Sequence, residues 1–86
     1  MQGYTNMEKQ LLDYLGEEIF DISVGLDPQT DLLAAGLDSL ALLKLLQFIE
    51  DSMLIRIPEG EIIEEHIRTV KNLVQLIGRL ERRQPA

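Results

Sequence analysis

The sequence of 86 residues contains no cysteine, a single histidine and few aromatic side chains. The lack of cysteine excludes disulfides and thiolate metal sites. Because 45% of the residues are hydrophobic but only 5% are aromatic, the core must consist of leucine, isoleucine and valine, which suit packed helices. A chain of this length builds one modest core. We therefore expect a single domain over residues 1–86, with flexible ends at 1–5 and 84–86.

Basic residues are also scarce, and long apolar runs are missing. Eight Lys and Arg stand against fifteen Asp and Glu, which gives a formal charge of −7. An acidic surface disfavours nucleic acid and anionic membranes and favours partners that present Lys and Arg. No apolar run approaches the roughly 20 residues that cross a bilayer, and the first ten residues do not resemble a signal peptide. We expect a cytoplasmic protein that binds neither nucleic acid nor membrane.

The first half of the chain predicts two helices separated by a long loop. Thr5 to Glu8 has the T-x-x-E form of a capping box, and apolar spacing predicts a helix over Asn6–Phe20. Asp38 is the expected N-cap of a second helix over Ser39–Met53. The stretch between them, 21–36, is broken by glycine and proline. Long ordered loops in small domains are usually functional.

The second half predicts a minor helix and a long one. The segment 57–67, "IPEGEIIEEHI", is too short and too interrupted for more than one or two helical turns. Thr69 is the expected N-cap of the last helix, whose apolar face repeats at helical spacing and whose basic end, Arg79 to Arg83, complements the helix dipole. The predicted fold is all-α, a four-helix bundle with three longer helices and a short third one.

The second helix carries more apolar surface than one core-facing stripe needs. Its inward face is predicted to consist of Leu42, Leu45, Leu46, Ile49 and Met53. Leu40 and Leu43 lie on a different side, next to Ser39. Two interpretations stay open for this apolar patch: the neighbouring loop covers it, or it is a contact surface for other proteins.

Ser39 is the residue whose position most needs an explanation. A serine after Asp38 at a helix start can belong to ordinary capping. The same place offers unpaired N–H groups and the positive end of the helix dipole, where a phosphate ester on the serine oxygen is best accommodated. Gly36 lets the preceding loop turn tightly without a side chain obstructing Ser39.

The stretch "DLLAAGLDSL", Asp31 to Leu40, resembles the D-L-x-x-x-G-x-D-S-L signature of acyl and peptidyl carrier proteins. The matching positions are Asp31, Leu32, Gly36, Asp38, Ser39 and Leu40. The resemblance continues with "IP" at 57–58 and "TV" at 69–70, so it spans nearly the whole chain. The ten-residue motif is specific, whereas either dipeptide alone is not.

This resemblance implies a non-enzymatic carrier with 4'-phosphopantetheine attached to Ser39, its cargo held as a thioester. A phosphopantetheinyl transferase would supply the arm from coenzyme A, and the residue matching Asp38 helps that transferase hold its metal. The positions of Leu40 and Leu43 match contacts to partner enzymes, and Lys44 and Gln47 belong to the same expected surface. The further partners implied are an acyl- or aminoacyl-loading ligase or adenylation enzyme and a downstream transferase or synthase, met in turn by a monomer.

The pattern departs from housekeeping fatty-acid carriers on the outer face of the second helix. Ala41, Lys44 and Gln47 stand where such carriers often place acidic or apolar contact residues. The stretch 58–70 is longer than in those carriers and is similar to the form in peptidyl, D-alanyl and specialised-metabolite carriers. We therefore expect a free-standing carrier of a dedicated pathway, with a fatty-acid synthesis carrier as the alternative.

Two other functions compete with that of a carrier. A serine enzyme needs a base oriented towards its nucleophile, but Ser39 lacks a G-x-S-x-G setting and His66 lies far along the chain. A helical adaptor that keeps the fold and only binds another protein stays open as an alternative. For His66 we expect an ordinary, partly exposed residue, and for the acidic residues 61–65 a solvated face, with no metal site.

Overall fold

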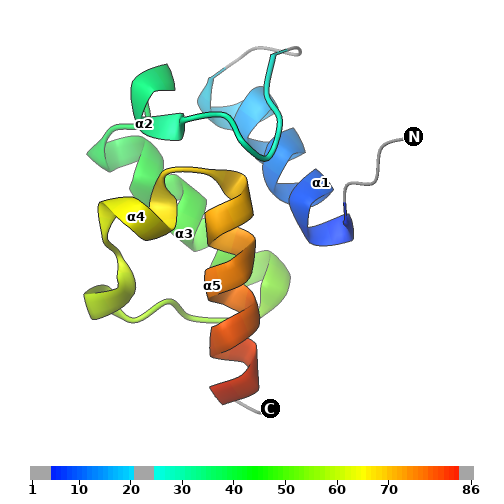
Figure 1. Cartoon of the computed structure of the whole chain (residues 1–86), viewed down its shortest axis with the longest axis vertical. Coiled ribbons are helices and arrows are strands. Elements are labelled where there is room, and N and C mark those ends of the chain that lie inside the picture. The colour runs from blue at the N-terminus through cyan, green and yellow to red at the C-terminus, as the bar shows by residue number, and fades with distance from the viewer. Residues whose placement is uncertain (1–4, 21–24, 84–86) are drawn as a thin grey trace.

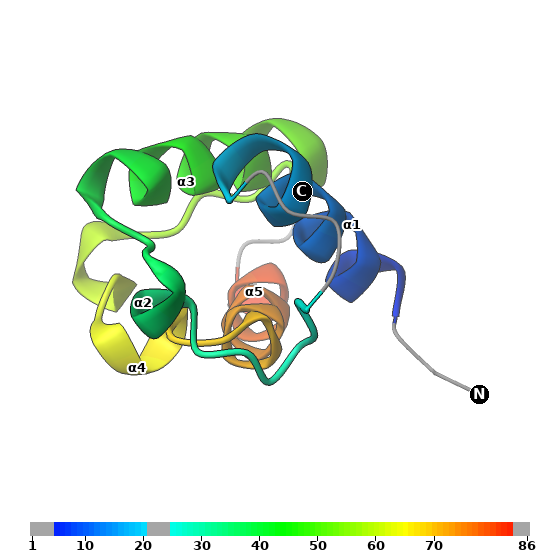
Figure 2. The ribbon, with the colours of Figure 1, turned by 90° about the horizontal axis from the view of Figure 1, so that it is seen from above.

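The computed structural model describes residues 5–20 and 25–83. They form α1 (Asn6–Tyr14), the helical turn η1 (Leu15–Ile19), α2 (Leu32–Ala35), α3 (Ser39–Met53), the turn η2 (Glu59–Glu61), α4 (Glu64–Ile67) and α5 (Val70–Arg83). Figure 1 shows their order, and Figure 2, which looks nearly along α5, shows α1, α3 and the pair α2 and α4 placed around it. The predicted all-α fold, with a long connection between the first two long helices, is confirmed.

The first helix begins as predicted but does not stay α-helical to Phe20. The Thr5 hydroxyl accepts from the Glu8 amide at 3.1 Å, and the Glu8 carboxylate accepts from the Thr5 amide at 3.0 Å, so the capping box is present. After Tyr14 the helix widens into the π-helical η1, which the Phe20 N–H closes on the Leu15 carbonyl at 2.8 Å. The predicted boundary at Phe20 is wrong by one residue, because the apolar spacing does not distinguish α from π geometry.

The other two long helices agree with the sequence. Helix α3 covers Ser39–Met53 as predicted and ends at Leu54, which has a left-handed φ of 53°. Helix α5 begins at Val70, and the Thr69 hydroxyl accepts from the Asn72 amide at 3.0 Å, as expected of an N-cap.

The short elements were less predictable. The segment 25–36 of the predicted loop contains α2, which the sequence analysis did not identify because four residues show no helical periodicity. The expected third helix is in fact two pieces, the 3₁₀ turn η2 and the single turn α4, separated by Ile62 and Ile63. Of the predicted flexible ends at 1–5 and 84–86, residues 1–4 and 84–86 lie outside the described residues, as do residues 21–24 of the loop. Thr5 is described and belongs to the cap of α1.

The core is aliphatic, as the composition predicts. In the described parts of the chain its buried members are all leucine, isoleucine or valine, namely Leu11, Leu12, Leu15, Leu32, Leu37, Leu45, Ile49, Ile55, Ile67, Val70, Leu73, Leu76, Ile77 and Leu80. On α3, Leu45 and Ile49 are fully buried. The other predicted inward residues, Leu42, Leu46 and Met53, are only half-buried, so the inward stripe of α3 is narrower than expected.

The segment before α3 is tied to the junction of α4 and α5. The Leu32 N–H donates to the Arg68 carbonyl at 2.7 Å, and the Lys71 N–H donates to the Pro28 carbonyl at 3.0 Å. The Arg68 guanidinium also lies 3.2 Å from the Asp31 carboxylate. These contacts place the start of α3 relative to α5. None of the helices in residues 5–20 and 25–83 is both long and apolar enough for a transmembrane span.

Candidate functional site

Ser39 is the first residue of the 15-residue helix α3, and its side chain is exposed. The first amides of a helix have no acceptor within the helix itself. The positive end of the dipole of α3 therefore lies at an accessible hydroxyl, which favours a negatively charged group there.

Asp38 holds the start of α3 in place without covering the serine. Its backbone is extended, and its carboxylate accepts from the Ala41 amide at 2.9 Å. The Asp38 carbonyl accepts the first helical bond, from the Leu42 amide, at 2.8 Å. The predicted N-cap is confirmed, and the cap fixes the direction in which Ser39 leaves the backbone.

Gly36 and Leu37 form the turn between α2 and α3. Gly36 ends α2 with a φ of 115°, a conformation that favours glycine. A Cβ there would lie 4.0 Å from the nearest heavy atom, on Phe20, which is ordinary contact. Backbone conformation rather than free space is thus the reason for glycine at this position. Leu37 is buried in the core and anchors the turn.

Asp31 is the N-cap of α2, as Asp38 is the N-cap of α3. Its carboxylate caps α2 by accepting from the Ala34 amide at 3.0 Å, and its second oxygen accepts from Arg68. The hydrogen bond from the Ala34 amide lowers the pKa of Asp31 most. Partial desolvation raises this pKa, and the hydrogen bond and positive charge of Arg68 lower it further. An ionised carboxylate therefore holds α2, and with it the turn that leads to Ser39.

The expected partner surface lies on the outer side of α3. Leu40 and Leu43 are 63% and 64% exposed, so the neighbouring loop does not cover them. Lys44 and Gln47 are exposed as well.

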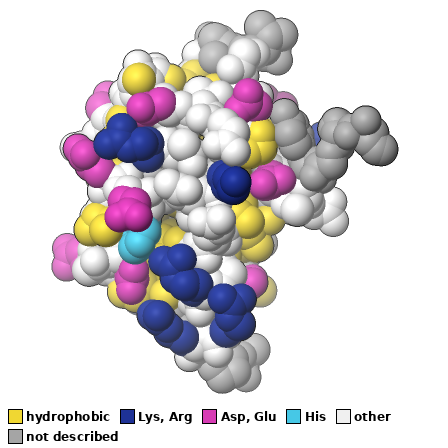
Figure 3. Space-filling model, in the orientation of Figure 1, with side chains coloured by type: hydrophobic (Ala, Val, Ile, Leu, Met, Phe, Trp, Pro, Cys, Tyr) yellow, Lys and Arg dark blue, Asp and Glu magenta, His cyan; other side chains and the backbone are white. Residues whose placement is uncertain are grey.

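Figure 3 shows where charged side chains gather on one face of the molecule, with Lys and Arg concentrated towards the C-terminal end of α5.

His66 is engaged elsewhere. Its Nδ1 lies 2.7 Å from the Glu61 carbonyl, and its Nε2 lies 3.4 Å from the Arg79 guanidinium. The histidine thus links α4 to η2 and α5, as expected of an ordinary structural residue. Among the described residues, no group of three or more His, Cys, Asp or Glu is arranged to hold a metal ion.

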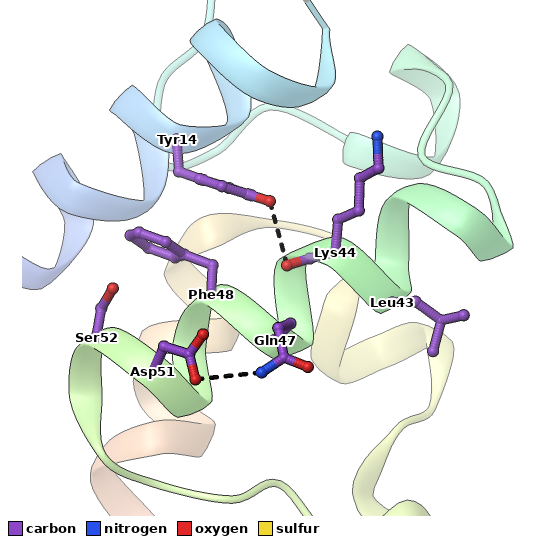
Figure 4. Close-up of a pocket in the computed structure, with 7 residues that line it drawn as sticks. All are labelled: Tyr14, Leu43, Lys44, Gln47, Phe48, Asp51 and Ser52. Atoms are coloured by element: carbon purple, nitrogen blue, oxygen red, sulfur yellow. Dashed lines mark hydrogen bonds between the residues drawn. The ribbon is translucent and has the colours of Figure 1, made fainter.

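A groove that the sequence does not predict lies between α1 and α3. We call it the α1–α3 groove; it has a volume of about 500 Å³ and is lined by Tyr14, Leu43, Lys44, Gln47, Phe48, Asp51 and Ser52 (Figure 4). Tyr14 and Phe48 stack with ring centroids 4.2 Å apart. Apolar periodicity indicates which residues leave the core stripe, but it does not predict that α1 and α3 diverge enough to leave a hollow.

The Tyr14 hydroxyl fixes one wall of this groove by donating to the Lys44 carbonyl at 3.2 Å. Desolvation, and secondarily the charge of Glu18, raises the pKa of this hydroxyl above 10.0. Tyr14 therefore remains a hydrogen-bond donor at neutral pH.

Comparison with known proteins gives similar chains of known structure. A chain in the crystal structure of Bradyrhizobium japonicum glycine:[carrier protein] ligase with its cognate carrier protein and an analogue of glycyl adenylate is similar, with a TM-score of 0.67 and 24% identity over 83% of this chain and 90% of that one. A chain in the same ligase complexed with glycylated carrier protein has a TM-score of 0.65 and 25% identity, over 80% of this chain and 90% of that one.

Because the matched part of this short sequence covers 90% of each of those chains, they are about as short as this one and must be the carriers in the two complexes. Comparison with curated protein sequences gives no match. A family model described as a phosphopantetheine attachment site matches residues 9–82. The chain therefore belongs to the phosphopantetheine-binding carrier family, and it is a carrier protein, not an enzyme.

Proposed function

We propose that Ser39 carries the phosphopantetheine arm and that the cargo is an amino acid, loaded by a dedicated ligase. The observation that supports the attachment point best is the exposed Ser39 hydroxyl at the capped start of α3. The proposal of an amino acid rests on the two similar carriers, which were solved with a glycine:carrier protein ligase, one of them glycylated.

The residues around Ser39 fit a phosphodiester. The exposed oxygen leaves room for the group, the helix end favours its negative charge, and Asp38 is occupied with the Ala41 amide. Phosphopantetheine, once bound, supplies a terminal thiol on which an acyl group is held as a thioester. The protein's own role is to present that arm, and Gly36 and Leu40 shape the surface beside it.

The partners that we propose follow from this role. A phosphopantetheinyl transferase and an aminoacyl ligase would contact the exposed surface of Leu40, Leu43, Lys44 and Gln47, and a downstream transferase or synthase would use the same surface afterwards. A carrier that docks with several enzymes in turn functions best as a monomer. We propose that residues 1–86 form its single domain. We also propose that it acts in the cytoplasm, where coenzyme A and these enzymes meet.

Mass spectrometry tests the attachment point. The purified protein is incubated with coenzyme A, magnesium and a broad-specificity phosphopantetheinyl transferase. The wild type should gain the mass of one phosphopantetheine, and Ser39→Ala should gain none. Ser52→Ala is the matched control because Ser52 is also an exposed serine of α3, and it should gain the full mass. A wild type that stays unmodified would show that the chain is a helical adaptor that has kept the fold.

The cargo is identified by isolating the protein from its own cells and measuring the group released from the thioester. An amino acid supports the proposal. A fatty acyl or malonyl group would contradict it and would favour a role in fatty-acid synthesis.

A further inference from the structure

The α1–α3 groove is a feature of the described residues that the proposed attachment site does not use. It lies along the outer side of the helix that Ser39 begins, and Tyr14 of α1 forms its opposite wall (Figure 4). Its volume of about 500 Å³ is within the range of small-molecule sites. The groove is open to solvent, so a tethered group can enter and leave it.

The lining of the groove changes character along α3. Leu43, which is 64% exposed, forms the end nearer to Ser39, and the stacked rings of Tyr14 and Phe48 form an apolar wall. The far end is polar, where the Gln47 amide donates to one oxygen of the Asp51 carboxylate at 3.1 Å. Figure 4 shows the Lys44 side chain extending away from this acidic end.

We infer that the α1–α3 groove holds the phosphopantetheine arm of the loaded protein, with Asp51 receiving the α-ammonium group of an aminoacyl cargo. The inference rests on the proposed function, since it needs an arm on Ser39. It adds a binding site on the carrier itself and a preference for cargo with a free amine.

The lengths agree. Ser39 and Asp51 are twelve residues apart on α3, which is about 18 Å at 1.5 Å per residue. The arm contains about thirteen bonds from phosphorus to sulfur, and at about 1.2 Å per bond for an extended chain it spans about 16 Å. An aminoacyl group adds a few bonds more, so its ammonium group reaches the level of Asp51.

The chemical groups of the arm and its cargo match the side chains that they would pass in the groove. The branched apolar part of the arm, close to its phosphate, would lie near Leu43, and its amide groups would pass the side chain of Gln47. An ammonium group at the far end can donate to the Asp51 carboxylate, which has a second oxygen besides the one bonded to Gln47. A fatty acyl group of the same length has no donor to offer there.

The test uses the full chain loaded through coenzyme A analogues in which an amide replaces the thioester and resists hydrolysis. One form carries a glycyl group, and the other carries a propionyl group, which has the same shape with a methyl group in place of the ammonium. Nuclear Overhauser effects are measured between the arm and the side chains of Leu43, Phe48 and Gln47. The pKa of the glycyl amine is measured by NMR titration.

Two variants separate Asp51 from general charge. Asp51→Asn removes the carboxylate of the groove. Glu50→Gln removes the same charge from the adjacent position, which is also exposed but does not line the groove. Both changes are at exposed sites, and unchanged melting temperatures will show that both variants fold.

The expected result is a set of contacts between the arm and the groove in the glycyl form, several-fold weaker in the propionyl form and in Asp51→Asn. The carboxylate should raise the pKa of the glycyl amine by roughly half a unit in the wild type and in Glu50→Gln, but not in Asp51→Asn. Equal contacts for the two cargoes, with no effect of Asp51→Asn, would contradict the role of Asp51.

A loaded protein that shows no contact between arm and groove would overturn the inference as a whole. The proposed function would still stand in that case, because the gain of mass at Ser39 is measured first on the same sample. Failure to load Ser39 would overturn both.

Discussion

Gly36 and Leu54 both have a positive φ, but the two residues differ in how well they suit it. Gly36 is required by its positive φ, although there is room for a Cβ. Leu54 is the opposite case, because it adopts a left-handed φ of 53° without being glycine and is 86% exposed. A leucine in this conformation is strained, and its side chain gains little from burial.

We therefore predict that Leu54→Gly raises the stability of the fold. Removing the left-handed strain should contribute about 1 kcal/mol, partly offset by the greater freedom of glycine in the unfolded chain. The measurement is the midpoint of urea unfolding. Leu54→Ala is the control, since it removes the apolar side chain but keeps the strained backbone, and it should not stabilise. A lower midpoint for Leu54→Gly would mean that the leucine side chain contributes contacts that outweigh the strain.

The two sides of helix α3 differ in burial. Leu45 and Ile49 are fully buried against the core, whereas Leu40 and Leu43 are more than 60% exposed. The inward side is narrow, because Leu42, Leu46 and Met53 are only half-buried. The proposed partner surface therefore consists of apolar side chains that the core does not bury.

Substitution to alanine should have different effects on the two sides of α3. Leu45→Ala leaves a cavity in the core and should cost about 2–5 kcal/mol of unfolding free energy. Leu43→Ala should change stability by less than about 0.5 kcal/mol but lower kcat/KM of the phosphopantetheinyl transferase by about fivefold or more. Urea unfolding and initial loading rates measure the two effects. Comparable losses of stability in both variants would show that Leu43 belongs to the core.

Across the whole fold, the proposed attachment site at Ser39 depends on contacts between segments far apart in the sequence. The turn before Ser39 is held through α2, and α2 is held by Asp31 and Leu32 on Arg68, at the junction of α4 and α5. The Arg68 guanidinium also lies 3.2 Å from Glu64, so it joins both acidic groups. The last third of the chain thereby positions the first turn of α3.

The pH dependence of stability should report the ionised Asp31 carboxylate, which the Ala34 amide stabilises most and Arg68 stabilises further. The pKa of Asp31 lies below its ordinary value of 3.8, so folding favours the ionised carboxylate. Its stabilisation is fully present above the ordinary pKa and is lost as the pH falls through the lowered one. Asp31→Asn keeps a capping side chain but loses the charge, so its urea midpoint should be lower than that of the wild type at pH 7.

The difference between the two proteins should shrink and vanish as the pH falls below the lowered pKa of Asp31. Asp13→Asn removes the same charge at an exposed ion pair of α1 and corrects for the change in net charge. A difference between wild type and Asp31→Asn that is independent of pH would show that the carboxylate charge plays no part.

The sequence was sufficient for the local features of this protein. The capping box at Thr5, the N-caps Asp38 and Thr69, the bounds of α3 and the aliphatic core all follow from side chains acting on their nearest neighbours or from periodicity. The carrier motif could also be recognised from the sequence, because its residues are consecutive.

Only the tertiary structure decided the features that need two distant segments. The contact of Asp31 and Leu32 with Arg68 joins residues 36 or 37 positions apart. The α1–α3 groove is lined by residues of two helices, with Tyr14 stacked on Phe48. The turns α2, η2 and α4 were also missed or merged, since elements of three or four residues have too few apolar positions for a period to show. Packing against the rest of the chain, rather than local propensity, stabilises such elements.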